Sequence, residues 1–367
     1  MALTLLSFTF MGFLVIGVPV AFAIGLSSIT AIMVEDLPLA VAFQQMTSGM
    51  NAFSFLAIPF FIFTGELMLY GGIADRIVAF AKSLVGHVRG GLGMSNVVAC
   101  TLFGGVSGSP VADVSAMGSV MIPMMKREGY HADYAVNVTT HAALVGALMP
   151  TSHNIIIYTL AAGGKVSIAA LIAAGVVPAV ILTLCNLAAA YFVARSRGYP
   201  AGTFPGWHIV LRSLVAAAPG LFVVVLIITG ILSGVFTATE SAAVAVLYAL
   251  ALTVFVYRSL TWDQFVRAAS KAVKTTGVVL LLIGISATFG YLISFYGVAE
   301  KTGELMASVS TSPWAIFLMV NIILFVLGTF LDMAATILIC TPIFLPICMQ
   351  YGICLLYTSD AADDTPC

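Results

Sequence analysis

Long apolar runs separated by short polar or basic segments make up most of this chain. The runs are continuous rather than alternating in segments of about 10 residues, so they favour membrane helices over the strands of a membrane barrel. A helix needs about 20 apolar residues to cross a bilayer. Runs that meet or approach this length lie at 4–33, 53–70, 169–193, 214–232, 240–257 and 276–295. The pattern predicts an all-α integral membrane protein.

Further apolar stretches are interrupted by small, polar or proline residues. They are 92–125 with a break at 104–110, 134–162 with a break at 149–154, and 314–349 with a break near 328–332. Backbone that is not helical survives at membrane depth only where protein buries it or a wet cavity adjoins it. These breaks are therefore the first places to look for function.

Basic residues orient the chain, because Lys and Arg gather in cytoplasmic loops. A basic amphipathic connection at 73–89 precedes the 92–125 stretch, and Lys126 and Arg127 follow it. Both ends of the stretch then lie in the cytoplasm, which predicts a re-entrant hairpin. In this topology twelve of the fourteen basic residues are cytoplasmic, all except Lys165 and Lys301.

Two parts of the sequence resemble each other. Residues 113–123 align with 332–342 at an offset of 219, with Asp at the start and Pro at the end of both. Upstream, 72–76 match 297–301 in the order of acidic and basic residues. The charge rule places the base of the first hairpin inside and that of the second outside, and related halves in opposite orientation are typical of inverted-repeat transporters.

The repeat divides the chain into a first half, 1–166, and a second half, 167–353. Residues 354–367 differ in character, with three Asp in five positions. This tail resembles translated sequencing-adapter read-through, which predicts that it is not native and that the second repeat is incomplete. The alternative is a genuine acidic tail.

Composition restricts the class of protein further. Hydrophobic residues make up 61% of the 367 positions and charged residues 8%, whereas soluble domains carry about 25% charged residues. A soluble enzyme or binding module is therefore excluded. The net charge of -1 gives no sign of nucleic-acid binding. The six cysteines form no CxxC pair or His/Cys cluster, so we expect no cofactor and no metal beyond a transported ion.

The break in the first hairpin offers oxygen ligands. Gly104, Ser107 and Ser109 belong to the segment Gly-Gly-Val-Ser-Gly-Ser-Pro. An opened turn of this kind presents carbonyls and hydroxyls to a small cation. The alternative interpretation is a glycine-rich packing kink.

The break at 149–154 combines a proline with a polar run. Pro150 removes a backbone donor and clashes with the carbonyl four residues earlier, so carbonyls near Gly146 and Met149 are free to hold a cation. The helix that restarts beyond Pro150 directs free N–H groups at an anion. Side chains on the predicted substrate side are Ser109, Thr151, Ser152 and Asn154. The alternative is a simple proline kink.

Four acids lie in or near the predicted spans, and such residues are functional candidates by default. They are Glu66, Asp113, Glu240 and Asp332. For Asp113 and Asp332 the alternative is a structural role, in which each carboxylate caps the returning helix of its hairpin. Glu240 follows Thr239 at the start of a small-residue helix, where Thr239 is the expected cap.

An enzyme is the competing class. The segment Gly105-Val-Ser107-Gly108 matches the short GxSG pattern of rhomboid-type intramembrane serine proteases. His141 or His153 would supply the base. A lone histidine in a membrane helix is more often a packing residue, and the pattern is only four residues long.

At the level of family, residues 1–353 resemble the large membrane subunit of tripartite ATP-independent periplasmic (TRAP) transporters of the dicarboxylate type. The resemblance rests on segments that occur in the family's order along the chain: 57–63 (Ala-Ile-Pro-Phe-Phe-Ile-Phe), 107–113, 118–123, 236–243 and 330–332. It implies an elevator-type, inverted-repeat fold with two re-entrant helical hairpins and broken helices. It also implies a multi-pass protein of the bacterial inner membrane that is not an enzyme.

The resemblance further implies sodium-driven import of organic acids such as C4-dicarboxylates. The implied partners are a small membrane subunit and a periplasmic substrate-binding protein, besides the lipid bilayer. The cation ligands it implies are Gly104, Ser107, Gly146, Met149, Pro150 and, for the second site, Gly328.

The sequence departs from the family pattern in several places. The usual second proline after Pro150 is Thr151 here, and the family's Thr-Pro-Thr-Glu is Thr-Ala-Thr239-Glu240. The family also continues past residue 353 with another broken helix, so an inactive fragment is a further alternative. A serine-directed covalent label would separate a protease from a transporter.

Overall fold

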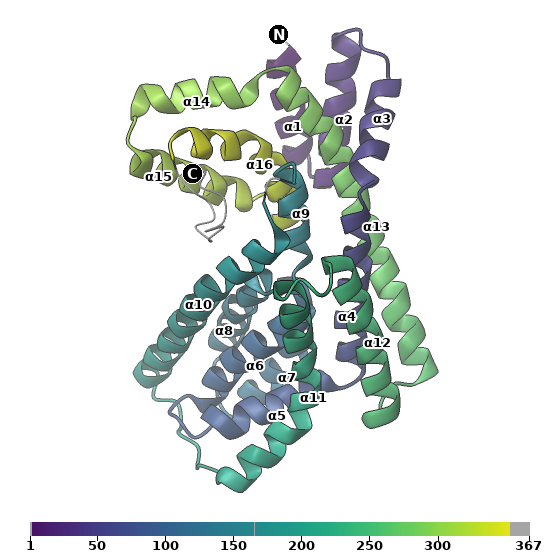
Figure 1. Cartoon of the computed structure of the whole chain (residues 1–367). Coiled ribbons are helices and arrows are strands. Elements are labelled where there is room, and N and C mark those ends of the chain that lie inside the picture. The colour runs from purple at the N-terminus through teal and green to yellow at the C-terminus, as the bar shows by residue number, and fades with distance from the viewer. Residues whose placement is uncertain (1, 165, 353–367) are drawn as a thin grey trace. The chain divides into compact units, whose positions relative to one another are not determined.

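A computed structural model describes residues 2–164 and 166–352 (Figure 1). Across these residues the regular elements are helices, and one isolated bridge joins Arg89 to Ala201. Six helices are long and apolar enough to cross a membrane, or seven if the broken helix at 132–161 counts as one span. The predicted all-α membrane fold is confirmed. The tail at 354–367 lies outside the described residues.

The chain forms two compact units that interleave along the sequence. One contains the described parts of Met1–Phe55, Ile156–Ser167 and Thr275–Cys367, and the other contains Leu56–Ile155 and Ile168–Lys274. We call them the terminal unit and the hairpin unit. The predicted halves, 1–166 and 167–353, divide the chain by its sequence repeat, whereas the two units divide it by packing. The division into repeats stays a prediction.

The hairpin unit contains most of the predicted spans. Its helices are α4 (Ala57–Tyr70), α5 (Ile73–Val85), α6 (Gly91–Ser107), α7 (Pro110–Arg127), α8 (Ala132–Ala143), the 3-10 helix η2 (Leu144–Leu148), α10 (Ile168–Ser196), α11 (Trp207–Leu232), α12 (Ala238–Ala251), the π-helix η3 (Leu252–Val256) and the start of α13 (Trp262–Phe295). Helix α5 buries its apolar face, whereas its charged residues Asp75 and Lys82 are exposed. This is the pattern expected for an amphipathic connection.

Helices α6 and α7 form the first predicted hairpin and lie side by side (Figure 1). Gly108 joins them in the left-handed region at φ +60°, which suits a residue without a side chain. Ser109 caps α7 by accepting a hydrogen bond from the Ala112 N–H at 3.4 Å, and Pro110 takes the first helical position. The predicted break at 104–110 was too long, because α6 stays helical through Ser107.

The terminal unit contains α1 (Ala2–Val15), α2 (Val20–Val34), α3 (Ala40–Met50), most of α9 (His153–Ala161), the rest of α13, α14 (Val298–Val309), α15 (Pro313–Gly328) and α16 (Met333–Gln350). The second predicted hairpin is present as α15 and α16. Helices α5 and α14 both begin after a left-handed glycine, Gly72 and Gly297. This shared start supports the sequence repeat.

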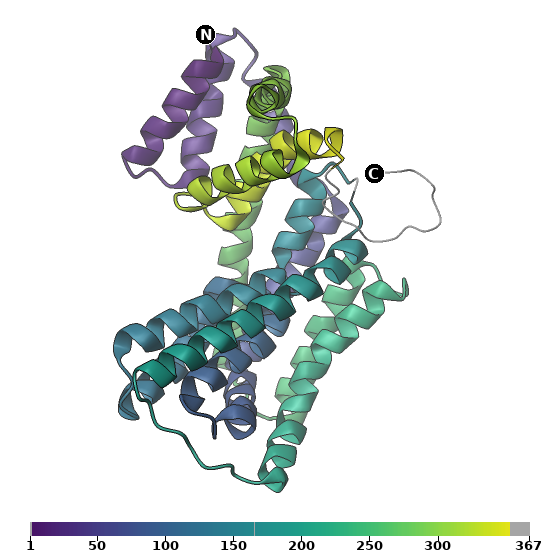
Figure 2. The same cartoon turned by 90° about the vertical axis from the view of Figure 1, so that its left-hand side faces the viewer.

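The single span predicted at 4–33 is wrong. Figure 2 shows α1 and α2 as separate helices packed side by side. Gly17 adopts φ +86° and Pro19 follows it, so the helix stops and the chain turns back. Helix α3 was not predicted at all. Helix α13 begins at Trp262 rather than 276, because its polar first turns include an Asp263–Arg267 pair four residues apart.

Candidate functional site

Asp113 lies at the centre of the candidate site, on the first turn of α7. Its side chain is completely buried. The Ser107 hydroxyl, at the end of α6, donates a hydrogen bond to Asp113 Oδ1. The second oxygen, Oδ2, is buried without a hydrogen-bond partner. A buried polar atom left unpaired is costly, so this oxygen requires an explanation.

Two glycines make room for the unpaired oxygen. A Cβ atom added to Gly146 would lie 2.4 Å from Asp113 Oδ2, and one added to Gly104 would lie 2.8 Å from it. The added atom at Gly104 would also lie 2.8 Å from the Gly146 Cα. The carboxylate therefore enters a space between two backbones that only glycine leaves open. We call Gly104, Ser107, Asp113 and Gly146 the carboxylate cluster.

The broken helix meets the hairpin tip directly. Met149 leaves the helical region at φ −78° and ψ 151°. A Cβ atom on Gly108 would lie 2.4 Å from the Thr151 carbonyl carbon, so the two backbones are in close contact. The Thr151 hydroxyl donates to the Gly105 carbonyl at 3.1 Å. That carbonyl belongs to the last turn of α6, which has no further helical donors of its own.

The predicted site residues fall into two groups. Gly104, Ser107 and Gly146 lie around the carboxylate of Asp113, whereas Met149 and Pro150 line an apolar cavity of about 260 Å³. The cation-ligand role of these five residues stays a prediction. The substrate-side residues Thr151, Ser152 and Asn154 are buried, and Asn154 Nδ2 donates to Ser152 Oγ at 3.1 Å. Ser109 is partly buried. Whether these side chains meet substrate stays a prediction.

Asp113 is the residue of the carboxylate cluster whose role the sequence left open. The sequence suggested a structural or coupling acid, with a helix cap as the alternative. The cap is wrong for Asp113, because Ser109 caps α7. Its position four residues beyond Ser109, on the first turn of the returning helix, was the available signal. The direction of its side chain was not readable from the sequence.

The second hairpin has a different geometry. Asp332 is exposed and caps α16 by accepting from the Ala334 N–H at 3.2 Å, so the capping interpretation is right here. Gly328 is exposed, and a Cβ atom added to it would meet nothing within 4 Å. In the described part of the chain, no cluster like the first one surrounds Gly328.

Glu240 has a local structural role. Its carboxylate accepts from the Thr237 N–H at 2.8 Å, and its own N–H donates to the Thr237 hydroxyl at 3.3 Å. This reciprocal pair is a capping box at the start of α12. The predicted cap, Thr239, is wrong, because Thr237 holds that position and Thr239 is buried two residues further on, in the first turn.

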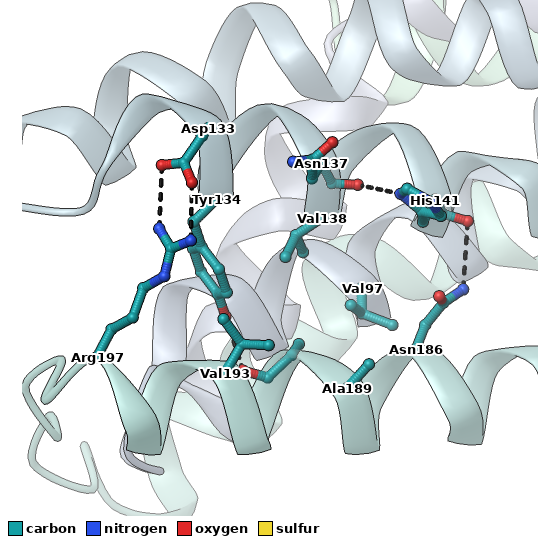
Figure 3. Close-up of a pocket in the computed structure, with 11 residues that line it drawn as sticks. Val97, Asp133, Tyr134, Asn137, Val138, His141, Asn186, Ala189, Val193 and Arg197 are labelled. Carbon is teal, nitrogen blue, oxygen red and sulfur yellow. Dashed lines mark hydrogen bonds and ion pairs between the residues drawn. The ribbon is translucent and has the colours of Figure 1, made fainter.

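A second cavity, of about 320 Å³, opens between α8 and α10 (Figure 3). Asp133 and Arg197 pair at 2.8 Å at one end, and this carboxylate raises the pKa of the Arg197 guanidinium above its usual range. At the other end His141 Nδ1 lies 2.8 Å from the Asn137 carbonyl. Asn186 Nδ2 donates to the His141 carbonyl at 3.2 Å. His141 thus lines this cavity, and its ring contacts a backbone carbonyl of its own helix.

Comparison with known proteins decides the family. The family model described as "Tripartite ATP-independent periplasmic transporter, DctM component" matches residues 7–358. This chain belongs to that family. The TRAP family assignment makes it a multi-pass inner-membrane transporter subunit rather than an enzyme. The protease alternative is therefore wrong. The Ser107 hydroxyl, which that alternative made the nucleophile, donates its hydrogen bond to the carboxylate of Asp113.

Curated relatives of this TRAP subunit cover most of its length. The uncharacterized protein YgiK of Salmonella typhimurium is 40% identical over 93% of this chain and 78% of its own. The sialic acid TRAP transporter large permease protein SiaM of Vibrio cholerae is 36% identical over 94% and 81%. The C4-dicarboxylate TRAP transporter large permease protein DctM of Rhodobacter capsulatus is 33% identical over 92% and 80%.

Proposed function

We propose that this TRAP large permease is a sodium-coupled importer of organic acids and that the carboxylate cluster holds a transported sodium ion. The unpaired, fully buried Oδ2 of Asp113 is the observation that carries this proposal. An isolated buried carboxylate is costly by several kcal/mol unless a cation or donors compensate it. A cation beside Oδ2 would compensate this one.

The chemistry of the cluster suits a hard cation. The Asp113 carboxylate, the Ser107 hydroxyl and the backbone carbonyls of Gly104 and Gly146 all offer oxygen atoms as ligands. We propose that carbonyls of Met149 and Pro150, farther along the broken helix, complete the set. No group of three or more His, Cys, Asp or Glu that could hold a metal occurs in 2–164 and 166–352. A set of neutral oxygens with one carboxylate is better matched to a monovalent ion than to a resident divalent metal. By the repeat, Gly328 would contribute to a second cation site.

The substrate class follows from the relatives and from the broken helix. The named substrates of SiaM and DctM are sialic acid and C4-dicarboxylates, which are both organic acids. We infer an anionic organic substrate, such as a C4-dicarboxylate, next to the helix start beyond Pro150. Its proposed contacts are Ser109, Thr151, Ser152 and Asn154. The proposed partners are a small membrane subunit and a periplasmic binding protein.

Sodium binding can be measured on the purified chain without its partners. A ligand that binds only the folded state stabilises it, by about 2.7 kcal/mol at 100 times its dissociation constant. We expect the thermal midpoint in detergent to rise saturably with sodium chloride but not with choline chloride. Asp113→Asn should abolish the rise, because Oδ2 loses its charge.

Ser119→Ala is the matched control. Ser119 is exposed on the same helix as Asp113, and its hydroxyl donates only to the Ala116 carbonyl, at 2.8 Å. This variant should keep the sodium response of the original chain. Equal responses to sodium and choline in the unaltered chain, or a full sodium response in Asp113→Asn, would refute the proposed cation site.

A further inference from the structure

Glu66 is a buried acid that the cation site does not use. It lies on α4 with 6% of its surface exposed. Its Oε1 is 2.9 Å from Lys271 Nζ, whereas its Oε2 is buried without a hydrogen-bond partner. Lys271, on α13, is 43% exposed, so water reaches the base but not the acid. Both residues belong to the hairpin unit.

The pair differs from the other ion pairs of the described residues. Asp133–Arg197 and Asp263–Arg267 join exposed side chains, and exposed pairs contribute little to stability. Within 2–164 and 166–352, Glu66–Lys271 is the ion pair with a buried carboxylate. Removing one partner would leave a buried charge or an uncompensated buried polar group, so the pair fixes α4 against α13.

The residue before Glu66 contacts the hairpin tip. A Cβ atom added to Gly65 would lie 3.3 Å from the Ser107 Cα and 3.6 Å from the Ser107 carbonyl oxygen. Helix α4 therefore supports the backbone of Ser107 at the place where its hydroxyl holds Asp113. A small rotation or shift of α4 would press on Ser107 or leave it unsupported.

We infer that Glu66 is a positioning residue for the cation site. Paired with Lys271, it sets the position of α4, α4 places Gly65 against Ser107, and Ser107 orients the carboxylate of Asp113. The inference rests on the proposed sodium site for its effect on ion affinity. Its structural part, the link from the ion pair to the hairpin tip, can be tested separately.

The first measurement is the sodium concentration that gives half of the thermal stabilisation. Glu66→Gln keeps the shape of the side chain but removes its charge, and Lys271→Met removes the partner. Both should raise the half-saturating sodium concentration by about fivefold or more, the lower end of typical coupling between linked sites. Lys271→Arg retains the pair and should stay within about twofold of the original chain.

The matched control breaks an ion pair on the same helix α13. Asp263→Asn removes the exposed pair with Arg267 and should leave the half-saturating concentration unchanged. If Glu66 only stabilised the fold, Glu66→Gln would lower the thermal midpoint without changing the half-saturating concentration. Provided that the unaltered chain responds to sodium, that result for Glu66→Gln would overturn the inference.

The second measurement needs no sodium. Hydrogen exchange followed by mass spectrometry reports on the amides of 104–113, where the Gly108 N–H donates to Gly104 at 2.9 Å and the Asp113 N–H donates to Ser109 at 2.9 Å. We expect faster exchange there in Glu66→Gln and Lys271→Met, and no change in Asp263→Asn. Unchanged exchange in the first two variants would overturn the inference even if the sodium proposal had failed.

Discussion

At Gly146 the backbone passes so close to Asp113 that the identity of a single residue decides whether the cluster can form. Glycine is often explained by its backbone freedom, but neither Gly104 nor Gly146 has a positive φ. Both lie in helical segments where alanine would be the better helix former. The space they leave for the carboxylate explains them instead.

Gly146→Ala tests this space. The added methyl group would lie 2.4 Å from Asp113 Oδ2, so the cluster must distort, at a cost of about 1–3 kcal/mol for an overpacked site. We expect a lower thermal midpoint and a lost sodium response. Gly290→Ala is the control, because its added atom meets nothing within 4 Å. A normal sodium response in Gly146→Ala would show that the cluster tolerates the methyl group.

Thr151 is a second decisive residue, because its hydroxyl satisfies the Gly105 carbonyl from 46 positions away in sequence. Thr151→Val keeps the shape and removes the donor, which should destabilise the folded chain by about 1–3 kcal/mol. Thr151→Ser keeps the hydroxyl and should lose less. The free energy of unfolding in denaturant, compared between the two variants, measures the hydrogen bond. A loss in Thr151→Ser as large as or larger than that in Thr151→Val would contradict a dominant role of the hydrogen bond, because only Thr151→Ser lacks the methyl group.

At the scale of elements, the two helical hairpins have similar sequences but place their acidic residues in different environments. The two hairpins match in helix length, with 17 and 18 residues in α6 and α7 and 16 and 18 in α15 and α16. Their acids differ, since Asp113 is buried beside Ser107 and Asp332 is exposed as a cap. The first hairpin is closed by contacts with the broken helix at Gly146 and Thr151.

The first hairpin should open toward the cytoplasm, because basic residues flank both of its ends. Arg89→Cys and Lys126→Cys replace exposed residues at these ends. In a background without the exposed Cys185, a membrane-impermeant maleimide should label both from the cytoplasmic side. Val111→Cys, 77% exposed in the isolated chain near the tip, should not react from that side. Labelling of the two ends from opposite faces would contradict the re-entrant topology.

At the scale of the whole molecule, the compact units do not follow the order of the sequence. The terminal unit collects segments from both ends and a short piece from the middle, whereas the hairpin unit holds the carboxylate cluster. Two relatives that match more than nine tenths of this chain are named as permeases for different acids. Under the proposed function, we expect a separate binding protein to contribute to the choice of substrate.

Reconstitution tests the proposed partners. In proteoliposomes with an inward sodium gradient, any uptake of a radiolabelled C4-dicarboxylate through this chain should require an added small membrane subunit and binding protein that match it. Potassium in place of sodium should abolish the uptake. Uptake by the chain alone would contradict the dependence on partners, and uptake without sodium would contradict the coupling ion.

The sequence by itself determined the class of the protein and the location of its breaks. Continuous apolar runs can be stable only in a membrane or a protein interior, so the all-α membrane fold followed from composition and pattern. The hairpin break and the interruption at 149–152 followed from Gly, Ser and Pro residues, whose effects on the backbone are local. Where several weak local signals competed, as at Gly17 and Pro19, the predicted single span was wrong.

Tertiary structure alone decided how the side chains at the breaks are used. Asp113 and Asp332 have similar neighbours in sequence, but one is buried between two backbones and the other caps a helix in the open. Thr151 bonds to a helix end 46 residues away, and Glu66 bonds to Lys271 across about 200 positions. Burial and hydrogen bonding depend on such distant contacts, which no pattern along the chain records.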